Sequence, residues 1–182
     1  MTFSYAQARA AGMTKYRLYR LRDTGAVEVL GRGLFRHTDA PPADVGLVAV
    51  RAPAATECLA SALTLYGLCD VIPAATDVAL SRGTRRPAVT AAVAWHSFDR
   101  GTFDVGRDSL DLDAATSIGL YSAERSIIDA FRTRGTEGHE LAYEAVRRWL
   151  RRPGFHPARL MTLVGAFPRV STPLRAALEV LL

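Results

Sequence analysis

The chain has 182 residues, of which 49% are hydrophobic and 23% are charged, and its formal net charge is +5. A chain of this size and composition folds as one soluble domain, or as a small domain joined to a medium one, without disulfides. A membrane-spanning protein is excluded, because no apolar run approaches the roughly 20 residues that a membrane helix needs. The N-terminus lacks the basic and apolar segments of a secretory signal, so we expect a cytoplasmic protein.

The positive charge is concentrated at the start of the chain. Residues 1–38 contain seven basic and two acidic side chains, whereas the other 144 residues carry 16 of each sign. A basic segment of this kind predicts a polyanionic partner, and DNA, RNA and anionic lipid are the candidates.

The residue types argue against several kinds of chemistry. Lys15 is the only lysine, so the chain has neither a Gly-Lys-Ser/Thr phosphate loop nor a nuclease core built on Glu-x-Lys. Cys58 and Cys69 form no Cys-x-x-Cys pair and the four histidines are scattered, so zinc spacing is absent. We expect reduced, buried cysteines, no bound metal and no cofactor.

The first 25 residues have the pattern of two short helices. Ser4 and Gln7 form a capping-box pattern, which starts a helix, and Gly12 is suited to end it. Thr14 is a good N-cap for a second helix that runs as far as Gly25. Two short helices joined in this way have the proportions of a helix-turn-helix.

At 100° per residue, the second helix divides into two faces. Leu18 and Leu21 face the first helix, whereas Tyr16, Tyr19 and Arg20 lie on the opposite side. Basic side chains read guanine edges or hold phosphates, and tyrosine donates to phosphate or stacks. A solvated basic face with tyrosines in the core is the alternative interpretation. The helix residues expected to contact DNA are Thr14, Lys15, Tyr16, Arg17, Tyr19 and Arg20.

After Gly25 the pattern changes from helix to strand. Residues 26–30 and 34–36 are strand-like and are joined by Gly31-Arg32-Gly33. An arginine at the tip of a glycine-rich hairpin is typical of a wing that contacts the DNA backbone or the minor groove. Arg32 is therefore a seventh candidate contact.

A polar, proline-containing link near residue 40 divides the chain. We expect a winged helix-turn-helix over residues 1–39 and a second domain over residues 43–182. The second domain has strands in its middle and helices afterwards, which predicts an α+β fold with a mixed α/β second domain whose C-terminal part is helical. The expected helices cover 43–51, 56–68, 123–134 and 142–152, with two more starting at Pro157 and Pro173; the expected strands are 78–80, 91–96 and short segments within 109–118.

The second domain has no recognisable catalytic constellation. Asp108, Asp111 and Asp113 could attract a divalent ion, but no glycine-containing calcium loop or closing glutamate follows them. No serine lies in a Gly-x-Ser-x-Gly context. The basic run 147–152, which includes Trp149, either contacts nucleic acid or an acidic partner or is a solvated helix end. We therefore expect no catalytic residues, and an enzyme that uses the three aspartates is the third-ranked hypothesis.

Several segments carry a family pattern. They are Phe3-Ser4-x-x-Gln7-Ala8-x-x-Ala11-Gly12, the Gly25 turn, Gly31–Arg36, Ser61–Leu68 with Ile72-Pro73, and Ser122–Asp129. Together they span most of residues 3–134 and resemble the AbiEi-type antitoxins of bacterial abortive-infection (type IV) toxin–antitoxin systems.

The resemblance implies an N-terminal winged helix that binds and represses its own promoter. It also implies a second, antitoxin domain that neutralises a toxin resembling a nucleotidyltransferase. The DNA-reading positions of the family fall on Thr14–Arg20 and Arg32 of this chain. Residues 61–68 and 124–129 resemble structural signatures of the second domain rather than active-site residues.

We therefore expect a non-enzymatic antitoxin that is also a transcriptional autorepressor. Its expected partners are double-stranded operator DNA, bound by two copies on repeated sites whether or not the protein is a homodimer in solution, and the toxin, with no membrane. About five or six phosphate contacts would make the affinity fall steeply with salt. The runner-up is a winged-helix transcriptional regulator whose second domain senses a ligand or dimerises.

Overall fold

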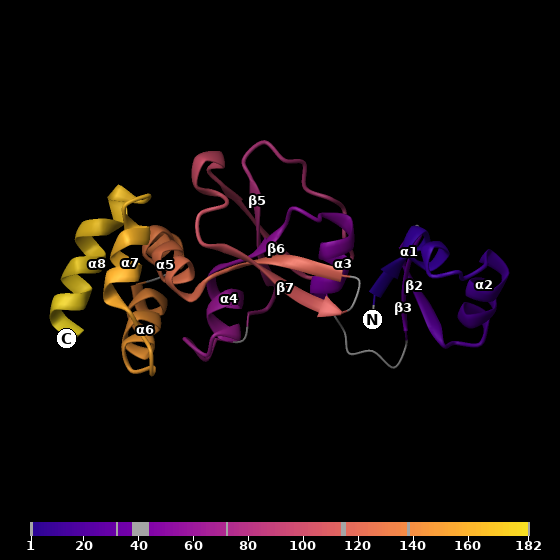
Figure 1. Cartoon of the computed structure of the whole chain (residues 1–182), viewed down its shortest axis with the longest axis horizontal. Helices are drawn as coiled ribbons and strands as arrows, with labels where there is room; N and C mark the ends of the chain where they lie inside the picture. Colours follow the sequence, from indigo (N-terminus) through magenta and orange to yellow (C-terminus); the bar gives the residue numbers. More distant parts are fainter. Residues whose placement is uncertain are drawn as a thin grey trace.

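The computed structural model arranges the chain as three lobes in a row (Figure 1). A small N-terminal lobe lies at one end, a mixed sheet occupies the middle, and the C-terminal helices lie at the other end. The structure describes residues 2–31, 33–37, 44–71, 73–113, 116–137 and 139–181. Arg32, Ile72 and the link predicted near residue 40 therefore lie outside the described residues.

The N-terminal lobe, here called the N-terminal module (residues 2–37), is a helix-turn-helix with a three-stranded sheet. Its elements are β1 (Thr2–Ser4), α1 (Tyr5–Ala10), α2 (Lys15–Asp23), β2 (Val27–Gly31) and β3 (Leu34–His37). The strands are antiparallel in the order β1-β3-β2, and the β2–β3 hairpin is the predicted wing. Strand β1 was not predicted, because three residues are too few to establish a period of two.

The predicted helix signals of the module are present. Gln7 donates its backbone N–H to the Ser4 hydroxyl at 3.1 Å, and Ser4 donates its own N–H to the Gln7 side chain at 2.7 Å. Gly12 and Gly25 end the two helices with φ values of +77° and +75°, which L-residues rarely adopt. The module encloses a small core of buried side chains: Phe3, Ala8, Leu18, Val27 and Phe35.

The middle of the molecule is a five-stranded mixed sheet. Its elements are α3 (Asp44–Arg51), β4 (Thr56–Glu57), α4 (Leu59–Leu65), β5 (Thr76–Ser81), β6 (Val93–Phe98), the 3₁₀ turn η1 (Arg100–Thr102), β7 (Arg107–Asp113) and β8 (Thr116–Tyr121). The strand order is β6-β5-β4-β8-β7, with β4 parallel to β8 and β5 parallel to β6. The other two pairings are antiparallel.

One predicted helix of this region starts too early. The prediction placed Thr56 and Glu57 in a helix, but the two residues form β4 in the centre of the sheet, and helix α4 begins only at Leu59. Both residues are buried, and β4 pairs with strands on either side. Pairing on both edges therefore overrides the helical pattern that continues from residue 59.

Four helices form the C-terminal lobe: α5 (Ala123–Glu137), α6 (His139–Leu150), α7 (Pro157–Val164) and α8 (Pro168–Leu181). The Ser122 hydroxyl accepts the N–H of Arg125 at 3.2 Å, and Pro157 opens α7, as predicted. The prediction that a helix starts at Pro173 is wrong, because Pro173 lies inside α8. The apolar face of α8 continues across the proline, since Val170 and Leu174 are both buried.

A buried arginine connects the end of the sheet to these helices. Arg125 is fully buried and donates through Nε to Asp129 at 2.9 Å. Its Nη1 donates to the carbonyl oxygens of Thr102, at 2.7 Å, and Val105. Asp129 also accepts from Arg132 at 2.5 Å. The structural role that the family resemblance implies for residues 124–129 agrees with these contacts.

These features place the chain in the predicted class: a winged helix-turn-helix followed by a mixed α/β region with a helical C-terminal part. In the part of the chain that the structure describes, no helix combines the length and the apolar character needed to span a bilayer.

Candidate nucleic-acid interface

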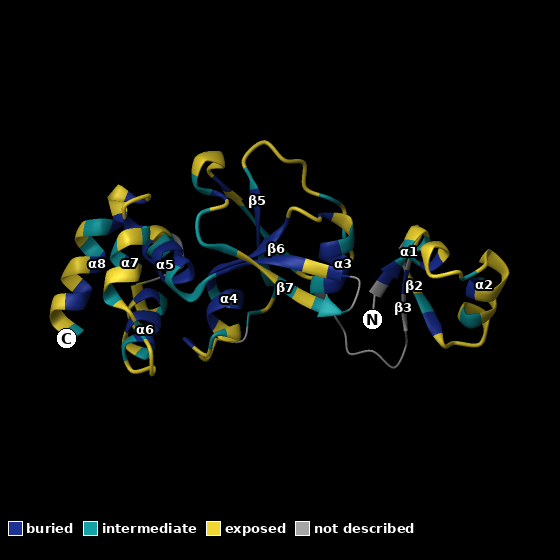
Figure 2. Cartoon of the chain, viewed as in Figure 1, coloured by how far each residue is buried: buried dark blue, intermediate teal, exposed yellow. Residues whose placement is uncertain are grey.

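Helix α2 presents most of its surface to solvent (Figure 2). Its one buried residue is Leu18, which packs into the core of the module. The hydroxyl of Thr14 caps the helix by accepting the backbone N–H of Arg17 at 3.2 Å. The cap therefore fixes the first turn of α2, which carries the predicted contacts Lys15, Tyr16 and Arg17.

Removing this cap is expected to weaken the module. Thr14→Ala deletes the hydrogen bond to the Arg17 N–H and should cost about 1 kcal/mol of local unfolding free energy. Hydrogen exchange of the α2 amides measures this loss. Thr14→Ser keeps the hydroxyl and should exchange like the parent protein, whereas equal exchange in the alanine variant would show that the cap contributes no stability.

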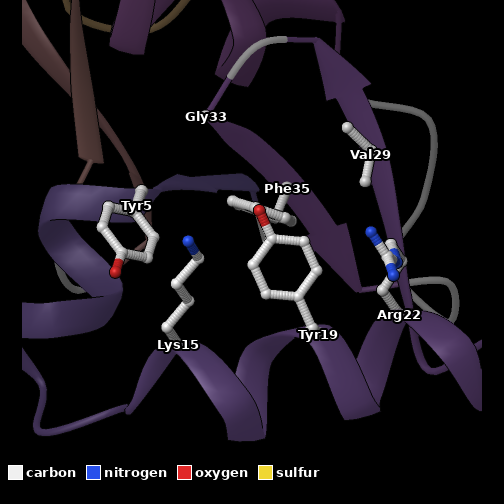
Figure 3. Close-up of a pocket in the computed structure, with 7 residues that line it drawn as sticks. All are labelled: Tyr5, Lys15, Tyr19, Arg22, Val29, Gly33 and Phe35. Carbon is white, nitrogen blue, oxygen red and sulfur yellow. The ribbon is translucent and has the colours of Figure 1, made fainter.

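One row of side chains on α2 faces the wing. Lys15, Tyr19 and Arg22 point from the helix toward the β2–β3 hairpin (Figure 3). The Lys15 ammonium lies 5.7 Å from the centre of the Tyr19 ring, and the Arg22 guanidinium lies 4.5 Å from it. The phenol is thus flanked by two cations, an arrangement that the negative face of an aromatic ring favours.

This row forms one wall of a groove between helix and wing. The groove has a volume of about 670 Å³. It is lined by Tyr5, Lys15, Tyr19, Arg22, Val29, Gly33 and Phe35. Polar and charged groups come from the helices, whereas the wing contributes the apolar side chains of Val29 and Phe35 (Figure 3).

Arg22 was not among the predicted contacts, although it belongs to this row. Its Nε and Nη2 donate to the same oxygen of Asp23, at 2.8 and 2.7 Å. The spacing i, i+4, i+7 of Lys15, Tyr19 and Arg22 places the three residues on one side of a helix. That spacing is readable from the sequence and would have identified Arg22.

The other predicted residues of α2 lie on the side away from the core. Tyr16 is 77% exposed, and Arg17 and Arg20 are also exposed. The prediction grouped Tyr19 with Tyr16 and Arg20, whereas in the structure Tyr19 is half-buried and lines the groove. The tip residue Arg32, the seventh candidate, lies outside the described residues.

A second cluster of titratable groups lies on the central sheet. His96 Nε2 lies 2.9 Å from one oxygen of Asp77, and the other oxygen lies near Ser61. The Ser61 hydroxyl accepts the backbone N–H of Asp77 at 2.8 Å. These bonds join α4 to β5 and β6, so the cluster has a structural role.

Glu57, which is buried beside this cluster, has a shifted pKa. Burial, and secondarily the charge of Asp77, raise its pKa from the ordinary 4.5 to about 7. The folded state therefore binds the proton more tightly than the unfolded chain does. The contribution of Glu57 to the free energy of unfolding is fully present below about pH 4.5, and it is lost as the pH rises through about 7.

The variant Glu57→Gln should remove this pH dependence. At pH 8 it should be more stable than the parent protein by about 1–3 kcal/mol, because an uncharged amide replaces a buried carboxylate. At pH 4 the two proteins should unfold within about 0.5 kcal/mol of each other. Urea denaturation of both proteins at both pH values measures these differences in stability. The prediction is refuted if the variant and the parent protein differ by the same amount at pH 4 and pH 8.

The second domain has two further sets of candidates, which are the aspartates Asp108, Asp111 and Asp113 and the basic run 147–152. Among the residues that the structure describes, no three His, Cys, Asp or Glu side chains are grouped to hold a metal ion. In the basic run 147–152, Trp149 is buried against Phe155, with ring centres 5.7 Å apart. Arg148 pairs with Asp70. The run therefore presents no aromatic surface for nucleic acid, which favours the interpretation as a solvated helix end.

Comparison with known proteins agrees with this geometry. Residues 2–37, which are the N-terminal module, match the family model described as a transcriptional regulator, AbiEi antitoxin. Among solved structures, the RV2827C protein from Mycobacterium tuberculosis is similar over 97% of this chain and 76% of its own chain. The TM-score is 0.54 at 16% sequence identity, which shows a shared fold. None of the curated proteins that were compared matches. The sequence similarity to the AbiEi antitoxin family of transcriptional regulators thus covers the N-terminal module.

Proposed function

We propose that this protein represses its own operon and neutralises the toxin encoded with it. The observation that carries the proposal is the exposed basic helix α2 beside a wing, within the segment that matches the regulator family. A recognition helix of this kind lies in the major groove, with its N-terminal residues near the base edges. The proposed contacts are Thr14, Lys15, Tyr16, Arg17, Tyr19, Arg20 and Arg32.

One small module gives limited affinity for a single DNA site, so we propose that two copies bind a repeated operator sequence in the cytoplasm. A reporter gene placed behind the DNA upstream of the coding sequence tests repression in cells. The parent protein should reduce expression, and Arg20→Ala combined with Arg32→Ala should restore it. Arg159→Ala removes an exposed arginine of α7 and should repress like the parent protein.

The second part of the proposal concerns the toxin. We propose that residues 44–181 neutralise a nucleotidyltransferase-like toxin by a non-enzymatic route. The support is the antitoxin family of the module and the resemblance of Ser61–Leu68 and Ser122–Asp129 to the second domain of such antitoxins.

Co-expression of the full chain with the neighbouring toxin tests this. Growth should be restored by the parent protein and equally by the Arg20→Ala, Arg32→Ala variant, because neutralisation does not use the DNA-binding residues. A failure of both proteins to restore growth would instead favour a transcriptional regulator whose second domain senses a ligand or dimerises.

A further inference from the structure

We propose that α2 divides its DNA contacts between two rows of side chains. The wing-facing row of Lys15, Tyr19 and Arg22 grips backbone phosphates in the groove, and the outward row of Tyr16 and Arg20 reads base edges. The inference rests on the proposed function only in requiring that the module binds DNA.

The chemistry of the groove fits a phosphodiester chain. Two cations and the hydroxyls of Tyr5 and Tyr19 come from the helical side, and apolar side chains come from the wing. Cations and phenol hydroxyls bind phosphate oxygens, whereas the apolar wall suits the sugars between the phosphates. The wall formed by α2 and the wall formed by the wing lie on two sides of the groove (Figure 3).

The Arg22 cation of this row already has partners in the protein before any ligand binds. The Arg22 guanidinium stacks on Tyr19 and is held by Asp23, which takes two of its five N–H donors. Lys15 lies seven residues earlier, about 10 Å along the helix axis. The two cations are therefore placed to contact different phosphates of one strand.

The outward row, Tyr16 and Arg20, is exposed to solvent and lies outside the groove. Tyr16 is 77% exposed, and Arg20 lies one helical turn further along the same side. Neither residue lines the groove. An exposed arginine on a helix in the major groove can donate two hydrogen bonds to guanine, and an exposed tyrosine can contact the thymine methyl group.

Equilibrium DNA binding across a range of salt concentrations separates the two rows. The probes are the duplex immediately upstream of the coding sequence and a shuffled duplex of the same composition. Lys15→Gln and Arg22→Gln should weaken binding to both duplexes by the same factor. Each should also make the slope of log K against log salt shallower by about 0.9.

The uncharged and outward contacts should behave differently. Tyr19→Phe should weaken both duplexes equally at an unchanged slope, because a neutral contact releases no counterion. Arg20→Gln should reduce the preference for the upstream duplex about tenfold to a hundredfold. Arg159→Gln, in the C-terminal helices, is the matched control for charge and should leave both quantities unchanged.

Two results would overturn the division. One is a loss of sequence preference in Lys15→Gln or Arg22→Gln, and the other is an unchanged salt slope in both variants. All of the substituted side chains are at least partly exposed, and thermal unfolding profiles that match the parent protein will show that each variant is folded.

If the parent protein binds the two duplexes equally, the proposed autorepression fails, but the salt slopes still test the phosphate row. Salt-independent binding by the parent protein would overturn the phosphate row.

Discussion

Replacing Arg125 by methionine is expected to lower the free energy of unfolding by about 3–5 kcal/mol, the loss typical of breaking a buried ion pair. Methionine keeps much of the apolar stem but removes every donor. The carboxylate of Asp129 then keeps only Arg132, and the carbonyl groups of Thr102 and Val105 lose the hydrogen bonds that Arg125 donates. Urea denaturation of the full chain measures the change.

The position of Arg125 explains why the loss should be large. Its guanidinium lies 4.1 Å from the centre of the Tyr121 ring, at the end of β8, and 4.5 Å from that of Phe167, just before α8. One side chain thus contacts both the end of the sheet and the residue that precedes the last helix. Asp129 is fully buried, so loss of the guanidinium leaves its carboxylate poorly compensated.

Two further variants serve as controls for the stability measured in Arg125→Met. Arg147→Met removes an exposed arginine of α6 and should change stability by less than about 0.5 kcal/mol. Adding Asp129→Leu to Arg125→Met should recover part of the loss, because no buried charge is then left alone. If the stability of Arg125→Met lay within about 1 kcal/mol of the parent protein, the role assigned to Arg125 would be contradicted.

Leu18→Ala is expected to unfold the N-terminal module and leave the rest of the chain folded. Leu18 is 1% exposed and belongs to a core of five buried residues. Truncation of a buried leucine costs about 2–5 kcal/mol, and a module of about 40 residues has little stability in reserve. DNA binding should therefore be lost.

Hydrogen exchange resolved along the chain measures this. Amides of residues 2–37 should lose protection in Leu18→Ala, and those of residues 44–181 should keep it. Leu65→Ala, at a position 55% exposed, should match the parent protein in both regions. Loss of protection throughout the variant would show one cooperative unit and contradict the proposed division of the chain near residue 40.

Local signals in the sequence predicted most of the module. The Ser4–Gln7 capping box, the Thr14 cap and the glycines after both helices act within a few residues, and each is present in the structure. The wing was predicted for the same reason, since its strands are adjacent in the chain. Such signals do not depend on distant parts of the fold.

Features set by long-range packing were missed. Strand β4 has only two residues, and its place in the sheet comes from pairing with one strand more than 20 positions away and another more than 60 positions away. Pro173 was expected to start a helix, but the apolar face of α8 packs continuously across it. Neither outcome follows from local propensity, because tertiary contacts decide both.

The candidate interface was predicted in part. Helical periodicity located the exposed basic side of α2, but it could not show which residues face the wing, since the hairpin's position is a tertiary feature. That position separates Tyr19 from Tyr16 and brings Arg22 beside Tyr19. A shift of the wing therefore changes which residues line the groove without changing the helix.

Equilibrium binding to the protein's own upstream DNA tests the central claim most directly. The parent protein and the Arg20→Ala, Arg32→Ala variant are compared on this duplex and on a shuffled duplex, at two salt concentrations. We expect the parent protein to bind the upstream duplex about a thousandfold or more tightly than the shuffled one, and the variant to lose this preference. Equal affinity of the parent protein for the two duplexes would contradict autorepression by this module.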